Sequence, residues 1–179
     1  YADTMEKTLF SIISISINVV ALTYFGRSIL KKETEPHIFT WGIWSITMLI
    51  VFFAQLSDGA GVGAWPTGVS AAFALTIVML TYRQENNLHI TKPDWVILSI
   101  ALGCLPLWLV TSTPLPTVII LTVVDLFGYA PTFRKSYHSP QKEPIFTFIM
   151  GSAEMVAAIF ALEQYSVNTA LFAAAILMD

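Results

Sequence analysis

Apolar runs long enough to cross a lipid bilayer follow one another along almost the whole chain. A hydrocarbon core about 30 Å thick needs about 20 helical residues. The runs cover residues 8–25, 38–56, 65–82, 95–110, 115–133 and 145–162, and a seventh begins near Asn168. Pro106 interrupts the short fourth run, which we expect to extend to about Ser112. Because the runs are continuous rather than alternating in polarity, they predict an all-α integral membrane protein with seven transmembrane helices and not a barrel of strands.

The composition agrees with this class and excludes others. Only 12% of the residues are charged, against about a quarter in soluble domains. The sequence has no basic field for nucleic acid, and the single Cys104 excludes a disulfide framework. His37, His89 and His138 all lie in connections between the runs. No catalytic or metal-binding signature is present, so we expect no enzyme activity, no metal and no cofactor.

The basic residues are distributed unevenly between the two sides of the predicted bundle. The connections at 57–64, 113–114 and 163–167 contain no Lys or Arg. Eight of the nine basic residues follow the first, third and fifth runs, namely Arg27, Lys31, Lys32, Arg83, Lys92, Arg134, Lys135 and Lys142. Because positive connections stay in the cytoplasm, we predict a plasma (inner) membrane location with the N-terminus outside and the C-terminus cytoplasmic. The chain starts at Tyr1 and stops at Asp179 within an apolar run, so we expect both ends to be truncated.

Part of the sequence repeats at an offset of 107 positions. Residues 145–148 (Ile-Phe-Thr-Phe) match residues 38–41 (Ile-Phe-Thr-Trp), and Arg134 matches Arg27. In this register the first three runs correspond to the fifth, sixth and seventh, and the fourth run has no counterpart. The repeat therefore predicts two three-helix units joined by a connector helix.

The boundaries of these units follow from the connections. We predict a first unit over 1–83, a connector with the fourth helix over 84–114, and a second unit over 115–179 whose last helix is incomplete. Because a single connector helix reverses the chain direction once, both units have the same orientation. Parallel repeats of this kind occur in transporters.

One stretch carries a recognisable motif. Residues 128–131 (Gly-Tyr-Ala-Pro) end an apolar run, residues 134–135 (Arg-Lys) follow, and residues 143–144 (Glu-Pro) begin the next run. Together with the three-plus-one-plus-three plan and the outside N-terminus, this pattern resembles the SWEET and PQ-loop group of transporters. Thr132 stands where the PQ-loop pattern has Gln. The resemblance implies a substrate path between the units near the bilayer midplane, with Pro131 as a hinge.

Two acidic side chains are predicted in the middle of apolar helices. Asp125 matches Asn18 of the first unit, Glu154 matches Thr47, and Asp179 would lie at mid-depth of a complete seventh helix. A charge at mid-bilayer costs roughly 2.5–3.5 kcal/mol, so such residues face the bundle interior or water. We expect a polar site for a small solute or a proton, shared by Asp125 and Glu154, with Asp125 carrying more of any proton dependence. The alternative is that the carboxyl groups only hold the helices together.

Other candidate residues lie around this site. Gln55 and Asp58, followed by three alternating glycines, close the second run on the outer side. With Glu163 of the matching connection they are predicted to form an outer vestibule, although the glycines are equally typical of a plain tight turn. Trp44 lies deeper than the other tryptophans and is a candidate to stack on a solute ring, core packing being the alternative.

Two functions remain open from the sequence. The first is a transporter-like protein that moves a small polar solute through the lipid bilayer, with proton coupling as a further expectation. The second is a non-transporting membrane subunit that binds a partner complex or a second copy of itself. A continuous polar lining from Gln55 to Arg134 would favour transport, whereas a dry, well-packed interior with a large apolar outer face would favour the subunit.

Overall fold

The computed structural model describes residues 2–84, 92–111, 114–138 and 145–176, and Asp179 therefore lies outside the described residues. Over these ranges the chain is helical and contains no strand, which confirms the all-α prediction. The helices are α1 (Ala2–Leu30), α2 (Ile38–Ser57), α3 (Trp65–Gln84), α4 (Lys92–Thr111), α5 (Pro114–His138), α6 (Ile145–Ala161) and α7 (Val167–Ile176), with a short 3-10 helix η1 (Gly61–Ala64) before α3.

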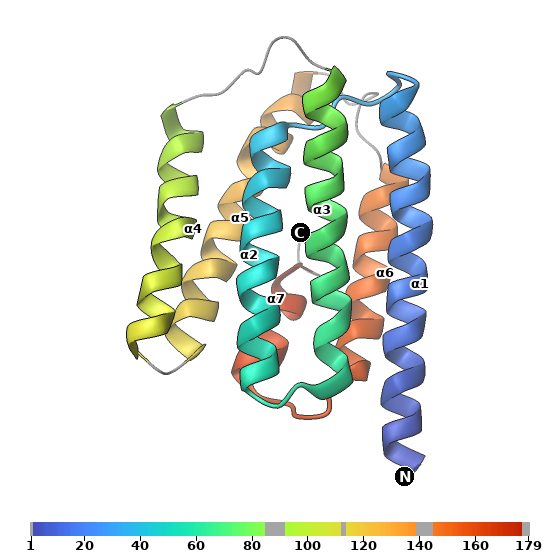
Figure 1. Cartoon of the computed structure of the whole chain (residues 1–179). Helices are drawn as coiled ribbons and strands as arrows, with labels where there is room; N and C mark the ends of the chain where they lie inside the picture. Colours follow the sequence, from blue (N-terminus) through green and yellow to red (C-terminus); the bar gives the residue numbers. More distant parts are fainter. Residues whose placement is uncertain (1, 85–91, 112–113, 139–144, 177–179) are drawn as a thin grey trace.

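Successive helices run in opposite directions and form an elongated bundle (Figure 1). The C-terminal ends of α1, α3 and α5 lie at the same end of the bundle, at the top of Figure 1. Arg27 and Arg83 occupy the last turns of α1 and α3 there, so we call this end the basic end. The connection between α2 and α3 and that between α6 and α7 lie at the opposite end.

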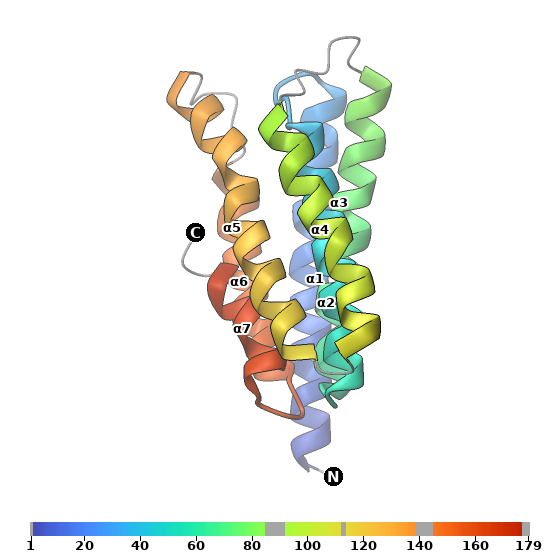
Figure 2. The same ribbon diagram turned by 90° about the vertical axis from the view of Figure 1, so that its left-hand side faces the viewer.

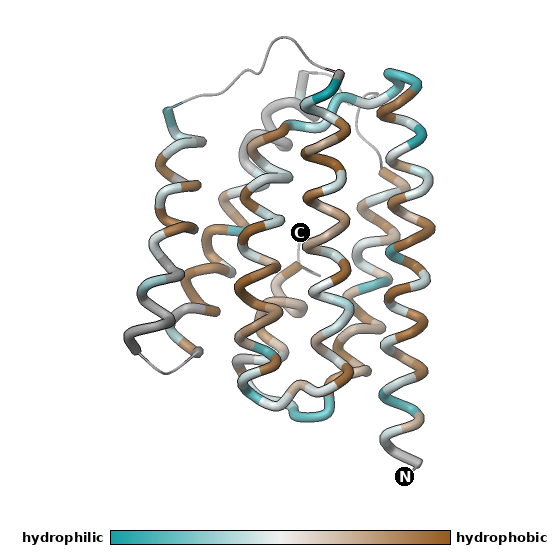
Figure 3. The backbone as a smooth tube through the Cα atoms, in the orientation of Figure 1, coloured by the Kyte–Doolittle hydropathy of each residue, from teal (hydrophilic) through white to brown (hydrophobic). Residues whose placement is uncertain are grey.

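Three helical segments of the described residues are long and apolar enough to cross a membrane. They are Thr4–Leu30, Ile38–Ser57 and Gly61–Arg83, and shorter apolar helices cover Val118–Tyr129 and Ile145–Ala161. Figure 3 shows hydrophobic positions along the middle of most helices and hydrophilic positions mainly near the ends of the bundle. These helices are compatible with a membrane protein, and the seven-span layout stays a prediction.

The two groups of three helices have the same internal packing. In the first group α3 packs against both α1 and α2, and in the second α7 packs against both α5 and α6. The groups meet crosswise, because α1 packs against α6 and α2 packs against α5. Figure 2 shows α5, α6 and α7 on one side and the first four helices on the other, and α4 packs against α5 and α2. The division of the chain into two repeated units stays a prediction from the sequence.

Aromatic side chains fill the core on the side of the basic end. The ring centroids of Trp41 and Trp44 are 5.0 Å apart, and those of Trp44 and Tyr129 are 4.5 Å apart. Phe25 and Phe73 pack on Trp41, and Phe148 packs on Tyr129. We call these residues the aromatic layer, which consists of Phe25, Trp41, Trp44, Phe73, Tyr129 and Phe148. Because its members come from α1, α2, α3, α5 and α6, it joins the two groups of helices.

Two helices extend beyond the apolar runs at the basic end. The first run was expected to end at residue 25 and the fifth at residue 133, but α1 continues to Leu30 and α5 to His138. The added segments contain basic residues, Arg27 in α1 and Arg134 and Lys135 in α5, which end an apolar run but not a helix. In α1 the added residues Ser28 and Ile29 are still buried in the bundle. Both Pro106 and Pro131 lie within helices, because a proline removes only one backbone hydrogen bond and neighbouring turns keep the helix intact.

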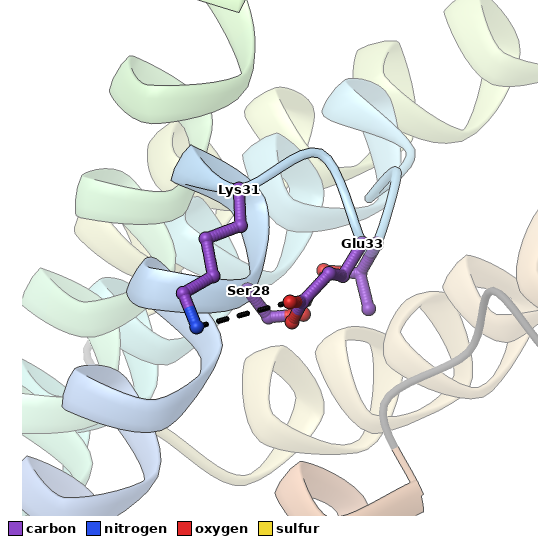
Figure 4. Close-up of polar contacts among 4 residues, drawn as sticks. Ser28, Lys31 and Glu33 are labelled. Carbon is purple, nitrogen blue, oxygen red and sulfur yellow. Dashed lines mark hydrogen bonds and ion pairs between the residues drawn. The ribbon is translucent and has the colours of Figure 1, made fainter.

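The end of α1 is closed by a Schellman motif. Lys32 N donates to Ile29 O and Glu33 N donates to Ser28 O, each at 2.9 Å. This motif places Lys32 at φ +60°, in the left-handed region that favours glycine. Lys31 Nζ lies 3.8 Å from a Glu33 carboxylate oxygen (Figure 4). Both side chains are exposed, so this ion pair adds little stability.

Candidate functional site

A buried polar cluster joins α6 to α1 and α3. Asn18 Nδ2 donates to Glu154 Oε2 at 3.0 Å and lies 2.9 Å from Ser70 Oγ. Ser70 Oγ lies 2.5 Å from Glu154 Oε1, so the three side chains form a closed set. We call Asn18, Ser70 and Glu154 the Glu154 cluster. Each of the three is 4% exposed, so these side chains make hydrogen bonds to one another away from solvent, and Asn18 Oδ1 is left without a partner.

The spacing of small residues brings α1 and α6 close enough for these contacts. Ser11, Ser14, Asn18 and Ala21 recur at intervals of three and four residues and are all buried, so they form one face of α1. Ser14 Oγ donates to the main-chain oxygen of Glu154 at 3.0 Å. Side chains this small let two helix backbones approach closely. We call this α1–α6 interface the seam.

A second buried polar contact joins α2 to α5. Thr47 Oγ1 lies 3.1 Å from Asp125 Oδ1, and we call this pair the Asp125 contact. Trp44 Nε1 donates to the main-chain oxygen of Asp125 at 3.4 Å. A Cβ atom at Gly128, one turn further along α5, would lie 2.9 Å from Trp44 Nε1. Only glycine at this position therefore lets the indole ring pack against α5.

The two contacts are equivalent under the sequence repeat. The offset of 107 positions relates Asn18 to Asp125 and Thr47 to Glu154. The structure pairs Asn18 with Glu154 and Thr47 with Asp125, so each acid contacts the neutral counterpart of the other. No described contact joins the two carboxyl groups. The structure thus places Asp125 and Glu154 in two crossed contacts between the units and does not bring them together in one shared site.

Of the residues predicted to form an outer vestibule, Gln55 connects α2 to α7, and Asp58 and Glu163 connect two loops. Gln55 Nε2 donates to Thr169 O at 2.8 Å, and Gln55 is buried. Ser166 Oγ donates to Asp58 Oδ2 at 2.5 Å, and Val62 N donates to Glu163 Oε1 at 3.2 Å. We call the four residues Asp58, Val62, Glu163 and Ser166 the end clasp, because they tie the connection after α2 to the connection after α6.

The glycines of this segment permit the close approach of the two connections. Gly59 and Gly61 have φ values of +79° and +58°, in the left-handed region. A Cβ atom at Gly61 would overlap the Glu163 carboxylate, and one at Gly63 would lie 2.6 Å from Leu162 Cα. The glycine run therefore has a structural role in bringing two backbones together, as the tight-turn interpretation anticipated.

The remaining candidates are placed as follows. Trp44 is buried within the aromatic layer, which is the core-packing alternative considered from the sequence. Pro131 lies inside α5, and its side chain lies outside what is described, so its role as a hinge stays a prediction.

Sequence reasoning missed Ser14 and Ser70. The spacing of four between Ser14 and Asn18 was the one available signal, since it puts both on one helix face.

An exposed ion pair joins Lys31 to Glu33 at the basic end of the bundle. Among the described residues, no group of three or more His, Cys, Asp or Glu side chains could hold a metal ion. The site can therefore exchange protons or donate hydrogen bonds, and it offers two acidic groups to a ligand.

Comparisons with known proteins give no further assignment. No family model matches the chain, and no curated protein or solved structure matches it.

Proposed function

We propose that this chain is an integral membrane protein that moves a small polar solute between two three-helix units. The observation that carries the proposal is the crossed pair of buried polar contacts, Asn18 with Glu154 and Thr47 with Asp125. Both contacts lie where one unit meets the other. A buried acid is costly in a membrane and is usually found where a solute or a proton passes.

Closed layers on either side of these contacts support the proposal. The aromatic layer fills the bundle toward the basic end, and the end clasp joins the two loops at the opposite end. A carrier that exposes its site to one side of the membrane at a time needs a separable closure on each side. These two closures support a carrier whose closed form shields the polar contacts from both sides.

The chemistry of the contacts limits the class of solute. Asp125 and Glu154 accept hydrogen bonds or bind a cation, and Asn18, Thr47 and Ser70 add neutral hydrogen-bonding groups. A neutral polyol, a neutral amino acid or a cationic solute fits this set better than an anion. Two carboxylates would repel an anionic solute.

A non-transporting subunit is the second candidate function. The observation in its favour is an apolar hollow on the outer face of α4, lined by Trp95, Val96, Ser99 and Ile100. The helix α4 lies at the edge of the bundle (Figure 1). A partner helix could cover this face, in which case the carboxyl groups would serve only to hold the helices together.

Uptake into proteoliposomes separates the two functions. The purified protein would be tested with a labelled hexose, alanine and lysine, against empty vesicles. We expect uptake of at least one solute, with Asp125→Asn reducing it at least tenfold and Glu6→Gln, an exposed change on α1, leaving it unaltered. If none of these solutes enters the vesicles and the protein co-purifies with a stoichiometric membrane partner, the subunit function is correct instead.

A further inference from the structure

We propose that the Glu154 cluster is a binding site for a single proton, and that this proton holds α6 against α1 and α3. The proposal deepens the proposed function, since it assigns the ion that would be coupled to solute movement. It differs from the expectation drawn from the sequence, which gave Asp125 the larger part in proton dependence. Its test needs no transport assay.

A count of hydrogen atoms is the first argument. Four polar contacts meet in the cluster: Asn18 Nδ2 with Ser70 Oγ at 2.9 Å and with Glu154 Oε2 at 3.0 Å, and Ser70 Oγ with Pro66 O at 3.0 Å and with Glu154 Oε1 at 2.5 Å. The Asn18 amide supplies two hydrogens, and the Ser70 hydroxyl supplies one. Three hydrogens cannot make four hydrogen bonds.

A proton on Glu154 completes the set. The carboxyl group then donates from Oε1 to Ser70 Oγ, and Ser70 donates its own hydrogen to Pro66 O. Ser70 Oγ accepts from Asn18 and from Glu154, which matches its two lone pairs. The Ser70–Glu154 separation of 2.5 Å is also at the short end for O–H···O hydrogen bonds. An ionised Glu154 would leave the contact between Ser70 and Pro66, or the one between Ser70 and Glu154, without a hydrogen.

The surroundings of Glu154 provide the second argument, because they offer no counter-charge. The elements packed against α6 are α1, α3, η1 and α7. The described segments of η1 and α7 contain no titratable side chain. On α1 and α3, none of the described titratable side chains contacts Glu154. They are Glu6, Lys7, Tyr24 and Arg27 on α1 and Tyr82 and Arg83 on α3. A buried carboxylate without a cation is unfavourable, so the neutral acid is preferred.

The orientation of Asn18 favours a proton over a metal cation. The amide turns its Nδ2 hydrogens toward both Ser70 Oγ and Glu154 Oε2, and these hydrogens would repel a metal ion placed between the oxygens. Asn18 Oδ1 is buried and has no hydrogen-bond partner. It is the free acceptor at which a water molecule would bind first when the seam opens, beside the carboxyl group that would release the proton.

Proton binding is thereby coupled to packing. The seam is stabilised by the Glu154 cluster and by the bond from Ser14 to the Glu154 main chain. Loss of the proton would leave a bare charge between closely packed helices, and hydration of that charge requires α6 to separate from α1. The loaded site therefore corresponds to the closed seam.

Infrared difference spectroscopy of the purified protein in lipid nanodiscs tests the proposal. We expect a carbonyl band of a protonated carboxyl group at neutral pH that disappears as the pH is raised. The band should be absent in Glu154→Gln and unchanged in the surface control Glu6→Gln. In Asn18→Leu, which removes the donor to Oε2, the band should move to higher frequency.

The outcomes are distinguishable. A band that persists in Glu154→Gln, or the lack of any titrating band, overturns the proposal. If Glu154→Gln does not fold, a titrating band that Asn18→Leu fails to move overturns it equally. Loss of the band on adding sodium at constant pH would assign the site to a metal cation and also overturn it. A titrating band without solute uptake supports the proton site and contradicts only the transport function, whereas uptake without the band contradicts only the proton site.

Discussion

Asn18 on α1 and Glu154 on α6 are separated by 136 positions in the sequence, yet their side chains meet at 3.0 Å in the interior of the bundle. Asn18 belongs to the first predicted unit and Glu154 to the second, so this hydrogen bond joins the two units. The equivalent contact joins Thr47 on α2 to Asp125 on α5, and it too pairs a neutral residue of the first unit with an acid of the second. The four residues therefore define where the two units are held together.

Removal of the Asn18 amide should destabilise the fold. Asn18→Ala leaves Glu154 Oε2 without its donor and removes one of the two donors to Ser70 Oγ, and an unsatisfied buried group costs about 1–3 kcal/mol. Ser16→Ala, on the exposed face of the same helix, removes a hydroxyl that bonds only to Ile12 O and is the matched control. Thermal unfolding in detergent measures both. Equal stability of the two variants would show that the Glu154 cluster does not stabilise the seam.

A side chain at Gly63 should separate the two connections at the end opposite the basic end. A Cβ atom there would lie 2.6 Å from Leu162 Cα, which is backbone and cannot move aside alone. We expect Gly63→Ala to lower the free energy of unfolding by about 1–3 kcal/mol. Gly151→Ala on α6, where an added Cβ meets nothing within 4 Å, should be neutral or slightly stabilising. A Gly63→Ala protein as stable as Gly151→Ala would refute this close approach.

The end clasp should act as a closure that can be locked. Asp58 and Ser166 are joined by a hydrogen bond of 2.5 Å, so the double variant Asp58→Cys/Ser166→Cys should form a disulfide on mild oxidation. If the clasp opens during transport, oxidation should stop solute uptake and a reductant should restore it. Each single cysteine variant serves as the control. Uptake that continues in the fully oxidised double variant would mean that this end stays closed throughout.

The sidedness of the chain can be tested by labelling. The excess of basic residues predicts that Lys31 faces the cytoplasm and that the connection carrying Glu163 faces outward. An impermeant thiol reagent applied to intact cells should modify Glu163→Cys and leave Lys31→Cys unmodified, in a background in which Cys104 is replaced by alanine. Because Lys31 is exposed, its protection would reflect the membrane rather than burial. The reverse labelling pattern would invert the orientation.

The apolar pattern of the sequence predicted where the helices lie, but it did not predict where α1 and α5 end at the basic end. The second, third and sixth predicted runs end within two residues of α2, α3 and α6, because apolar length determines where a buried helix can continue. The helices α1 and α5 continue past their apolar runs to Leu30 and His138. Basic residues such as Arg27 and Arg134 end an apolar run in the sequence, but a helix continues through them while its backbone hydrogen bonds still form.

The repeat identified equivalent residues but could not identify contacts. The offset of 107 positions relates Asn18 to Asp125 and Thr47 to Glu154, whereas the crossed pairing depends on how the two units pack together. Ser70 gave no signal, because its position in the second unit is occupied by a leucine, Leu177, and a serine within a helix commonly bonds only to its own backbone. Tertiary packing is what turns it toward Glu154.

The seam imposes an order on the biogenesis of the chain. The segment with Asn18 leaves the ribosome 136 residues before Glu154, an interval on the order of ten seconds at typical rates of synthesis. The amide of Asn18 lacks Glu154 throughout that interval, and the hydroxyl of Ser70 lacks it for the last 84 residues. The polar face that α1 and α3 present to α6 is thus incomplete until α6 has been synthesised.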